Sequence, residues 1–423
     1  MHTNAHNNKS AASPVRNPRR VAWNCLQRWG KGGIFAETLI ARECADMPAQ
    51  ERALAQAIIL GTLRNLRWLE HLCKALRPTG KLEEPARWLV MLGLCQLFIL
   101  RKAEHAAVSE TVALAPPRVR GLVNGMLRSA VRRKNEFTEE LAALPPAVRY
   151  SVPDWLAERW MTDFGLEETL PMLEWNVQAP PVYARINPLN PPAVIPEDWT
   201  ELAQAPGWYR LPSGLPHEAL RNGNIYVADP STRYCVALLA PQPGEKVLDA
   251  CAAPGGKSAA MIAATRGKIQ LLATDAEEHR LPQLRENLSR AGGENVTVAL
   301  HDWSAPCPEK WQGQFDAVLL DVPCSNSGVL QRRVDARWRI SPEEISRLAE
   351  LQSRILDCAC VAVKPGGRLV YSTCSIDREE DQAVVAQFLK NHPEFELLED
   401  YLALPHREQA DGAYAALLRK SRN

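Results

Sequence analysis

Residues 246–257 read KVLDACAAPGGK, and this stretch decides the fold of the second half of the chain. Its apolar start is followed at once by Pro254-Gly255-Gly256 and then by residues that favour a helix. Because glycine lacks a side chain, the backbone can turn sharply there and approach a ligand closely. The stretch predicts a strand, a glycine turn and a helix. On its own, a turn of this kind is more often structural than functional.

Four further short apolar runs follow, at 269–275, 296–300, 315–321 and 368–372, each bounded by glycine, proline or charged residues. Helical segments separate most of them. Strands that alternate with helices predict a parallel sheet covered on both faces, which is the α/β Rossmann-like arrangement. Ligands of such sheets bind outside the carboxyl ends of the strands.

An aspartate stands at or just after the end of four consecutive predicted strands: Asp249, Asp275, Asp302 and Asp321. Asp275 is placed to accept both hydrogens of a ribose diol, and Asp302 could accept from an adenine amino group. Each one alone is more often a cap or turn residue, but four in succession favour a nucleotide-type cofactor. Because no GxGxxG motif occurs, we expect a cofactor with one ribose and no pyrophosphate. S-adenosylmethionine meets that description.

Two cysteine motifs, DVPC at 321–324 and STCS at 372–375, each close one of the apolar runs. A thiolate is a natural nucleophile toward an electron-poor ring carbon. Its addition to carbon 6 of cytosine would make carbon 5 reactive toward a methyl donor, and a second thiol would help to release the adduct. Asp321 could hydrogen-bond the ring nitrogen or the exocyclic amine. Spacing does not decide whether Cys324 or Cys374 attacks.

Most cysteines in proteins are buried and inert. We expect seven cysteines in helix-like apolar settings to be buried and inert. They are Cys25, Cys44, Cys73, Cys95, Cys235, Cys358 and Cys360. The odd total of 11 cysteines and the absence of a secretion signal favour a reduced compartment, the cytoplasm. No CxxC or HExxH motif occurs, so no metal site is expected. No apolar run reaches the roughly 18 residues of a membrane span.

The 423 residues are enough for two or three domains, and their net charge of +1 hides an internal asymmetry. Residues 1–150 contain 23 Lys and Arg against 12 Asp and Glu. The front of the chain is therefore a candidate surface for a polyanion, although solvated arginine-rich helix faces are equally common. Apolar residues recur there at helical spacing, and 88–100 is apolar nearly all round, which predicts the buried central helix of a bundle.

We expect four segments along the chain. A flexible polar tail at 1–14 is followed by a helical RNA-binding bundle at 15–144. The proline-rich residues 145–235 predict a small α+β linker module that also binds RNA, and residues 236–423 form the catalytic domain.

An arginine-rich loop directly follows the first cysteine motif. A loop of this composition at the rim of the site would suit RNA, through phosphate neutralisation and base stacking. A solvated charged loop is the alternative. The residues concerned are Arg332, Arg333, Arg337, Trp338 and Arg339. Because a base inside a helix is out of reach, the target base should be unstacked or flipped.

The motifs quoted above resemble those of the bacterial RNA 5-cytosine methyltransferases that act on small-subunit ribosomal RNA. The front segment is similar to the antitermination factor NusB, through RRVA at 19–22, HAAVSETV at 105–112 and GLVNGMLR at 121–128. The resemblance implies a multidomain chain: an all-α NusB-like bundle, a small α+β module and a Rossmann-like methyltransferase domain. The chain departs from the family pattern at Asn326-Ser327, where a small residue and Thr are usual, and at Ala228, where Gln is common.

The resemblance also implies residue roles. Cys374 would be the attacking nucleophile and Cys324 would assist product release, with Asp275, Asp302 and Asp321 as cofactor or substrate contacts. The cofactor loop would be formed by Cys251, Ala252, Ala253, Pro254, Gly255, Gly256 and Lys257.

The implied partner is 16S ribosomal RNA before subunit assembly is complete, bound by a monomer with no membrane or metal involved. Two alternatives stay open. One is a transfer RNA cytosine-5 methyltransferase, and the other is a non-catalytic RNA-binding factor resembling antitermination proteins.

Overall fold

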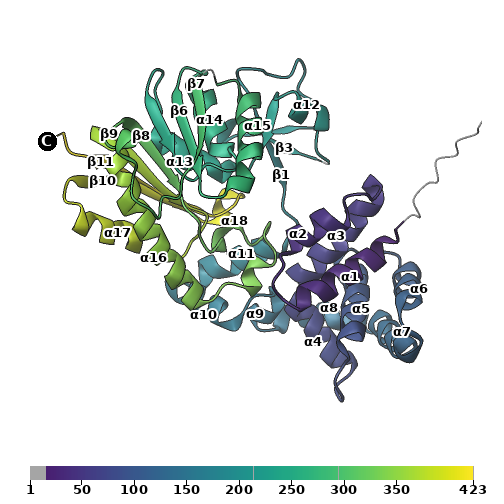
Figure 1. Cartoon of the computed structure of the whole chain (residues 1–423). Coiled ribbons are helices and arrows are strands. Elements are labelled where there is room, and N and C mark those ends of the chain that lie inside the picture. Colours follow the sequence, from purple (N-terminus) through teal and green to yellow (C-terminus); the bar gives the residue numbers. More distant parts are fainter. Residues whose placement is uncertain (1–15, 213, 294, 423) are drawn as a thin grey trace, which may run out of the picture. The chain divides into compact units, whose positions relative to one another are not determined.

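The computed structural model describes residues 16–212, 214–293 and 295–422, and the chain divides into two compact units, Met1–Val177 and Gln178–Asn423 (Figure 1). The predicted flexible tail, 1–14, lies outside the described residues. Within the described ranges, no helix combines the length and the apolar character that crossing a membrane requires.

The first unit is all helical, as predicted. Its longer helices are amphipathic and direct their apolar residues inward. They are α1 (Pro18–Gly30), α2 (Ala36–Glu43), α3 (Ala49–Arg64), α4 (Leu66–Leu76), α5 (Glu84–Leu94), α6 (Glu104–Leu114), α7 (Pro117–Arg132), α8 (Lys134–Glu140), α9 (Pro146–Arg149), α10 (Asp154–Phe164) and α11 (Leu166–Val177).

Helix α5 is the buried centre of this unit, which confirms the prediction for the first part of 88–100, whereas residues 98–100 are half-buried. It continues directly into a π-helical turn, Cys95–Ile99, and every residue from Trp88 to Leu94 is buried. Gly93 lets α7 pack closely, because a methyl group there would lie 2.6 Å from the side chain of Leu127. The predicted break at Pro116-Pro117 separates α6 from α7.

The boundary between the units falls after Val177, whereas the sequence predicted boundaries after residues 144 and 235. Helices α9 to α11 lie in the first unit, where α9 packs against α4 and Trp160 of α10 is fully buried. The strands of the predicted linker module lie in the second unit.

Those strands form a four-stranded antiparallel sheet in the order β2-β3-β1-β4. They are β1 (Val182–Ile186), β2 (Thr200–Leu202), β3 (Ala205–Leu211) and β4 (Ile225–Val227), with the short helix α12 (His217–Arg221) before β4. This small sheet has its own core of Ala184, Leu211 and Ile225.

The larger sheet of the second unit has seven strands in the order β10-β11-β9-β8-β5-β6-β7. Strands β5 to β9 are parallel: β5 (Lys246–Asp249), β6 (Gln270–Asp275), β7 (Asn295–Leu300), β8 (Phe315–Asp321) and β9 (Val363–Thr373). The chain runs outward from β5 to β7 on one side and returns with β8 on the other. The switch point, where ligands of such sheets bind, therefore lies between β5 and β8.

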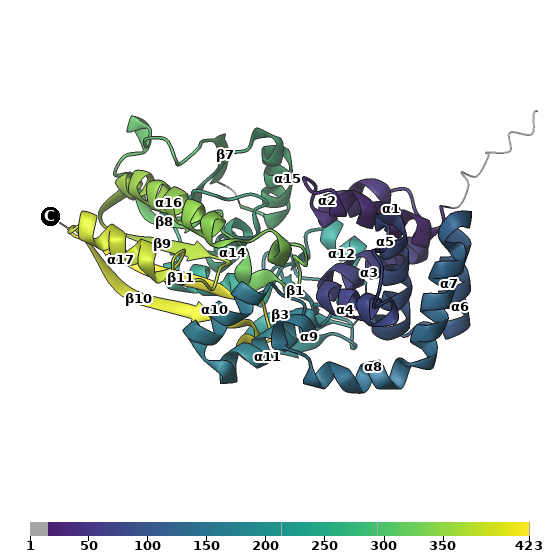
Figure 2. The ribbon, with the colours of Figure 1, turned by 90° about the horizontal axis from the view of Figure 1, so that it is seen from below.

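Alternate residues of the central strands face opposite layers. Leu248, Val318 and Tyr371 pack with α16 (Pro342–Ala359) and α17 (Gln382–Asn391), which lie side by side (Figures 1 and 2). Val247, Leu319 and Val370 pack on the other face with α13 (Arg233–Leu239), α14 (Gly256–Ala264) and α15 (Leu281–Ala291). A sheet buried on both faces explains why its strands are apolar throughout instead of alternating with polar residues.

The sheet is mixed, not purely parallel, which corrects that part of the prediction. Strands β10 (Phe395–Ala403) and β11 (Ala413–Lys420), joined through α18 (Pro405–Glu408), add two antiparallel strands beside β9. Most positions of the edge strand β10 are exposed, so its sequence lacks the continuous apolar run of a buried strand. The predicted fold class itself is confirmed.

Replacing Gly93 by alanine should destabilise the first unit. The added methyl group has no room beside Leu127, which is itself fully buried, and such overpacking costs about 1–3 kcal/mol. Gly125→Ala is the matched control: its new methyl group meets nothing within 4 Å, and alanine is favoured over glycine in a helix by about 0.5–1 kcal/mol. Urea unfolding of the full chain, followed by circular dichroism, measures both. Equal midpoints for the two variants would contradict this packing.

Candidate active site

The segment predicted to hold the cofactor, 251–257, leads from β5 into α14. It starts at the β5 side of the switch point. Gly255 begins the helix with a φ of 107°, a conformation that favours glycine. A methyl group on Gly256 would meet nothing within 4 Å, so the start of α14 is open. The carboxylate of Asp275 holds the loop, because it accepts from the backbone N–H of Ala253 at 3.0 Å.

The predicted strand-end acids differ in their surroundings. Asp275 is buried and also accepts from the N–H of Glu277 and from Arg280. Asp302 is exposed, and hydrogen bonds from Ser304 lower its pKa, which keeps it an ionised acceptor. Asp249 is buried, and the loss of hydration raises its pKa to about 7 although Ser258 donates to it. Its second oxygen, Oδ1, has no hydrogen-bond partner within the described part of the chain.

Lys257 and Asp321 form an ion pair across the switch point, one from the cofactor loop and the other from the end of β8. Burial alone would lower the pKa of Lys257, but the nearby carboxylate outweighs it and the net shift is upward. Lys257 therefore stays charged, and the pair joins the predicted cofactor loop to the first cysteine motif.

The structure brings the two predicted thiols together. Cys324 and Cys374 follow the neighbouring strands β8 and β9, and their sulfur atoms are 3.0 Å apart. The thiol of Cys374 donates to Oδ1 of Asn326 at 3.2 Å. The hydrogen bond with Cys374, followed by burial, raises the pKa of Cys324 well above its ordinary value. Cys324 thus remains a protonated thiol and can donate to the sulfur of Cys374.

The loops that carry the thiols are joined through their backbones. The N–H of Gly328 donates to the carbonyl of Cys374 at 3.0 Å, and the N–H of Gly412 donates to the carbonyl of Gly328 at 2.8 Å. A methyl group on Gly328 would lie 2.6 Å from the carbonyl oxygen of Gly412 and 2.8 Å from that of Cys374. Only glycine allows this approach.

Two further residues, which were not predicted as site residues, shape this site. Asn326 adopts a left-handed conformation and donates to the carbonyl of Cys324 while it accepts from Cys374. The buried carboxylate of Glu380 accepts from the N–H of Ser325 at 2.8 Å and from Gln352 at 2.9 Å. The departure from the family pattern at 326–327 was the available signal for Asn326. No local pattern marks Glu380.

A cavity of about 360 Å³ opens beside Cys374, which is the cysteine that lines it. Its wall comes from four parts of the second unit: the small sheet and the segment after it, the loop after β8, the loop after β9 and the turn before β11. The lining residues are Tyr183, Val227, Ala228, Asp229, Asn326, Val329, Arg332, Arg333, Cys374 and Asp411. The small sheet is therefore part of the site.

The arginine-rich loop is only partly a surface feature. Arg337 is completely buried and donates to the carbonyl of Leu330, so it is not available to RNA, which corrects that part of the prediction. Arg332 forms ion pairs with Asp229 and Asp411. Arg333 is exposed and lines the cavity, while Trp338 and Arg339 are half-buried.

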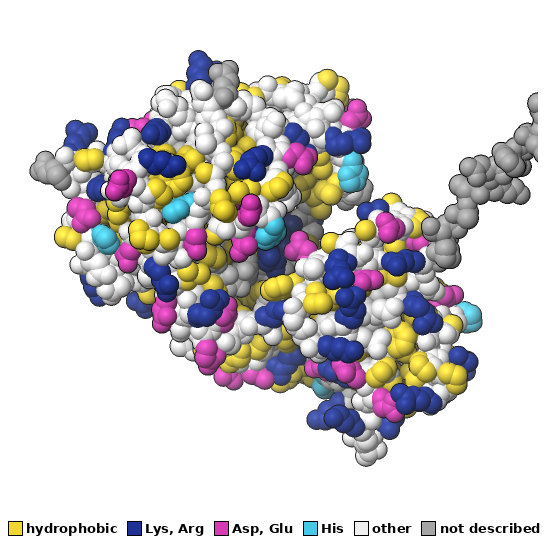
Figure 3. All heavy atoms as spheres, in the orientation of Figure 1, with side chains coloured by type: hydrophobic (Ala, Val, Ile, Leu, Met, Phe, Trp, Pro, Cys, Tyr) yellow, Lys and Arg dark blue, Asp and Glu magenta, His cyan; other side chains and the backbone are white. Residues whose placement is uncertain are grey.

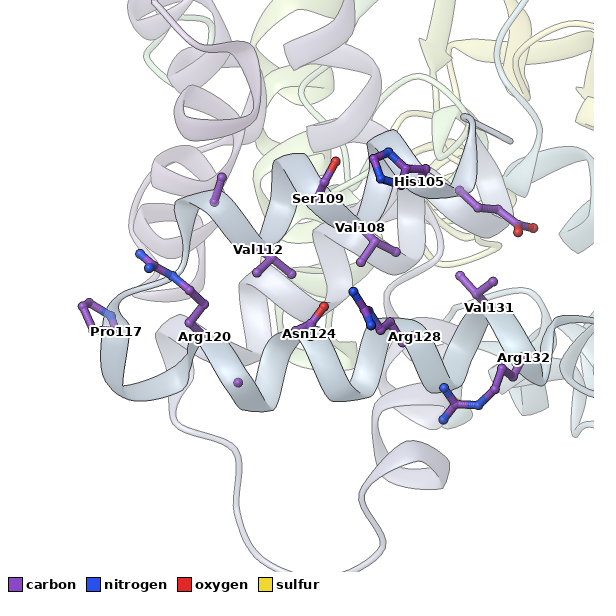
Figure 4. A pocket seen from close by; sticks show the side chains of 13 residues that line it. His105, Val108, Ser109, Val112, Pro117, Arg120, Asn124, Arg128, Val131 and Arg132 are labelled. Carbon is purple, nitrogen blue, oxygen red and sulfur yellow. The ribbon is translucent and has the colours of Figure 1, made fainter.

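A larger groove, of about 1210 Å³, lies in the first unit between α6 and α7. Figure 4 shows Val108 and Val112 of α6 facing Asn124 and Arg128 of α7 across it. Arg120, Arg128 and Arg132 give its α7 side a positive charge. Lys and Arg side chains are also prominent on the surface of this unit in Figure 3.

The chain matches two known families. Residues 236–419 match the family described as 16S rRNA methyltransferase RsmB/F, and residues 16–132 match the NusB family. A ribosomal RNA small subunit methyltransferase B from Yersinia enterocolitica is 36% identical over 96% of this chain and 99% of its own length.

Solved structures share the fold. The crystal structure of PH0851 matches with a TM-score of 0.75 at 23% identity, covering 97% of this chain and 100% of that chain. A methyltransferase homolog protein from Pyrococcus horikoshii matches with a TM-score of 0.54 at 26% identity, covering 65% of this chain and 97% of that chain.

The Rossmann-like sheet and these matches define an S-adenosylmethionine-dependent RNA methyltransferase with a NusB-like helical domain. Within that class, the chain belongs to the ribosomal RNA small subunit methyltransferase B family. The carboxyl ends of β5 to β7 fit the cofactor of this class. Gly256 leaves open space, Asp302 offers an exposed carboxylate, and Leu300 at the end of β7 presents an exposed apolar side chain.

An alkylating reagent should modify Cys374 before Cys324. Cys374 lines the cavity, whereas the raised pKa of Cys324 keeps that thiol protonated and unreactive near neutral pH. Brief treatment with iodoacetamide at about pH 7, followed by peptide mass spectrometry, measures the order. Modification of Cys324 should increase only as the pH rises. The Cys374→Ala variant is the control for peptide assignment, and faster labelling of Cys324 near neutral pH would contradict this assignment.

Proposed function

We propose that the chain methylates carbon 5 of a specific cytosine in 16S ribosomal RNA through a covalent adduct between Cys374 and the base. The observation that carries this proposal is the distance of 3.0 Å between the sulfur atoms of Cys324 and Cys374. Of these two residues, Cys374 lines the cavity. The family to which the chain belongs supports the RNA substrate.

The chemistry requires a nucleophile because carbon 5 of cytosine is unreactive while the ring keeps its conjugation. The thiolate of Cys374 adds to carbon 6, forming a C–S bond and moving an electron pair toward carbon 5. S-adenosylmethionine, when bound, would supply the electrophilic methyl group that carbon 5 takes up, and S-adenosylhomocysteine would be the leaving group. Loss of the carbon-5 proton to a base then restores the conjugation as the C–S bond breaks, and the thiolate of Cys374 is regenerated.

Cys324 is suited to assist the release of the product. Its raised pKa keeps a proton on its sulfur, so it can donate a hydrogen bond to the leaving sulfur of Cys374. Release is easier when the departing thiolate is stabilised by a nearby donor. The hydrogen bond from Ser325 to Glu380 fixes the backbone next to Cys324.

We propose that Asp321 contacts the amine edge of the base. It lies at the end of β8, beside the thiols, and Lys257 holds its carboxylate. A paired carboxylate can accept from the exocyclic amine of cytosine and stabilise charge that develops on the ring. Asp275 and Asp302 remain the proposed contacts to the cofactor ribose and adenine.

The groove between α6 and α7 is our candidate for contact with RNA outside the target site. Arg128 and Arg132 are exposed there, and neither forms an ion pair with another residue that the structure describes. Arginine side chains neutralise phosphates, while the valines and Asn124 of the groove offer apolar and polar contacts to bases. In the second unit, exposed Arg333 is placed to extend this role to the rim of the cavity.

The enzyme would act in the cytoplasm as a monomer on 16S RNA before subunit assembly is complete. The reactive thiols require a reducing compartment. A flipped base is more accessible in RNA that has not yet been assembled.

Mapping the modified nucleotide tests the proposed function. The purified protein is incubated with S-adenosylmethionine and either protein-free 16S RNA or bulk transfer RNA, and the products are digested for mass spectrometry. We expect 5-methylcytidine at one position of 16S RNA. Methylation of transfer RNA alone, or of another atom, would refute the proposal.

Substitution of the two thiols should give opposite products. Cys374→Ala removes the nucleophile and should abolish methylation. Cys324→Ala retains the nucleophile but lacks the proposed donor, so a protein–RNA adduct should accumulate and appear as a shifted band in a denaturing gel. Cys25→Ala, at a buried position of α1 in the first unit, is the control. Appreciable turnover by Cys374→Ala would point to the other thiol, and a gel without a shifted band for Cys324→Ala would remove its release role.

Removing the groove arginines should weaken RNA binding in a salt-dependent way. In the double variant Arg128→Ala, Arg132→Ala, the log–log slope of affinity against salt should decrease by about 0.7–0.9 for each phosphate that is no longer neutralised. Arg42→Ala, an exposed arginine of α2 outside the groove, is the control. Filter binding to 16S RNA between low and moderate salt measures the slopes, and identical slopes for the double variant and the wild type would exclude the groove.

A further inference from the structure

One carboxylate in the wall of the cavity beside Cys374 has an unused oxygen. Asp411 lines this cavity and is 6% exposed, and its Oδ1 has no hydrogen-bond partner among the residues that the structure describes. Leaving a buried acceptor unpaired is unfavourable. A donor group of a molecule that enters the cavity would satisfy it.

The other atoms of this carboxylate and its neighbours are fixed. Oδ2 of Asp411 accepts from Nε of Arg332 at 2.9 Å, and Oδ2 of Asp229 accepts from Nη2 of the same guanidinium at 2.7 Å. The backbone N–H of Asp411 donates to Oδ1 of Asp229 at 2.9 Å. Each contact of Arg332 and Asp229 is internal, so the network orients Asp411, while its almost fully covered Oδ1 stays unpaired until a ligand is accommodated against it.

The position of Asp411 relative to the strands indicates which part of a nucleotide it would meet. In the sheet, β9 lies between β11 and β8. Cys374 follows β9, Asp321 ends β8, and Asp411 stands two residues before β11. Asp321 and Asp411 therefore flank Cys374 on opposite sides.

The covalent chemistry then fixes the orientation of the base. The sulfur of Cys374 bonds carbon 6, which lies between carbon 5 and the ring nitrogen that carries the ribose. If the amine edge faces Asp321, the ribose faces the opposite side, toward Asp411. The sugar, not the base, is thus the part of the target nucleotide closest to this carboxylate.

We propose that Oδ1 of Asp411 accepts a hydrogen bond from the 2′-hydroxyl of the target ribose, so that Asp411 selects ribonucleotides over deoxyribonucleotides. The inference rests on the proposed function, because it uses the orientation that the Cys374 adduct imposes. The 2′-hydroxyl is the group that distinguishes RNA from DNA at a given nucleotide. Arg332 and Asp229 are positioning residues that hold the carboxylate in place.

The test combines a change in the enzyme with a change in the substrate. Once the methylated cytidine is mapped, RNA oligonucleotides are made with either a 2′-hydroxyl or a 2′-hydrogen at that nucleotide alone. Single-turnover methylation rates are measured with the full-length wild type, with Asp411→Ala and with Asp411→Asn. Asp198→Asn, an exposed carboxylate of the small-sheet region outside the cavity, is the control.

We expect removal of the 2′-hydroxyl to slow the wild type and Asp198→Asn about tenfold, which corresponds to one buried acceptor left unpaired. Asp411→Ala should be slow on the ribose substrate and lose no further rate on the deoxyribose substrate. Asp411→Asn keeps one acceptor oxygen, so it should restore part of the discrimination. A purely structural role would slow both substrates equally in every Asp411 variant.

The inference is overturned if the wild type is indifferent to the 2′-hydroxyl, or if Asp411→Ala retains the full wild-type preference. Thermal unfolding and calorimetric measurement of cofactor binding establish whether each variant is folded. If Asp411→Ala does not fold, the comparison of the two substrates is made with Asp411→Asn. Formation of 5-methylcytidine by the wild type on the unmodified oligonucleotide tests the proposed function separately. A failure of discrimination alone leaves that function intact.

Discussion

The site depends on the close approach of three backbone segments at Gly328. This residue donates to the carbonyl of Cys374 and accepts from the N–H of Gly412, so one glycine joins the loops after β8 and β9 to the turn before β11. No side chain fits there, because both nearest neighbours are backbone oxygens. The sulfur–sulfur distance and the position of Asp411 both follow from this approach. The parallel sheet alone would bring the thiols to the same edge but would not set their separation.

The two antiparallel strands at the edge of the sheet complete the site. Strand β11 pairs with β9 and brings the turn that contains Asp411 beside Cys374. The small sheet supplies the opposite wall through Tyr183, whose hydroxyl donates to the carbonyl of Gln409 at 2.6 Å. A five-stranded parallel sheet would provide the cofactor crevice and both thiols but only part of a nucleotide cavity.

Local patterns were sufficient to predict the helical front unit, the five parallel strands and the glycine turn, because each depends on residues close in sequence. The two thiols could be predicted as neighbours because the carboxyl ends of parallel strands share one edge of the sheet. Glu380 and the role of Asp411 depend on interactions between distant segments, which no local pattern encodes. Strand β10 was missed because its residues are mostly exposed. The arginine-rich loop was predicted as a surface because composition does not reveal that Arg337 turns inward to the carbonyl of Leu330.

The inward arginine also bears on how the loop withstands proteases. Four arginines within 332–339 would make an extended loop an easy target for trypsin, which needs the chain to enter its cleft in an unfolded form. Here Val334, Ala336 and Arg337 are buried, so the bond after Arg337 is sheltered in the folded protein. Arg333 alone among the four is exposed, but Val334, on the other side of the bond that trypsin would cut, is buried, so the folded loop shelters this bond as well.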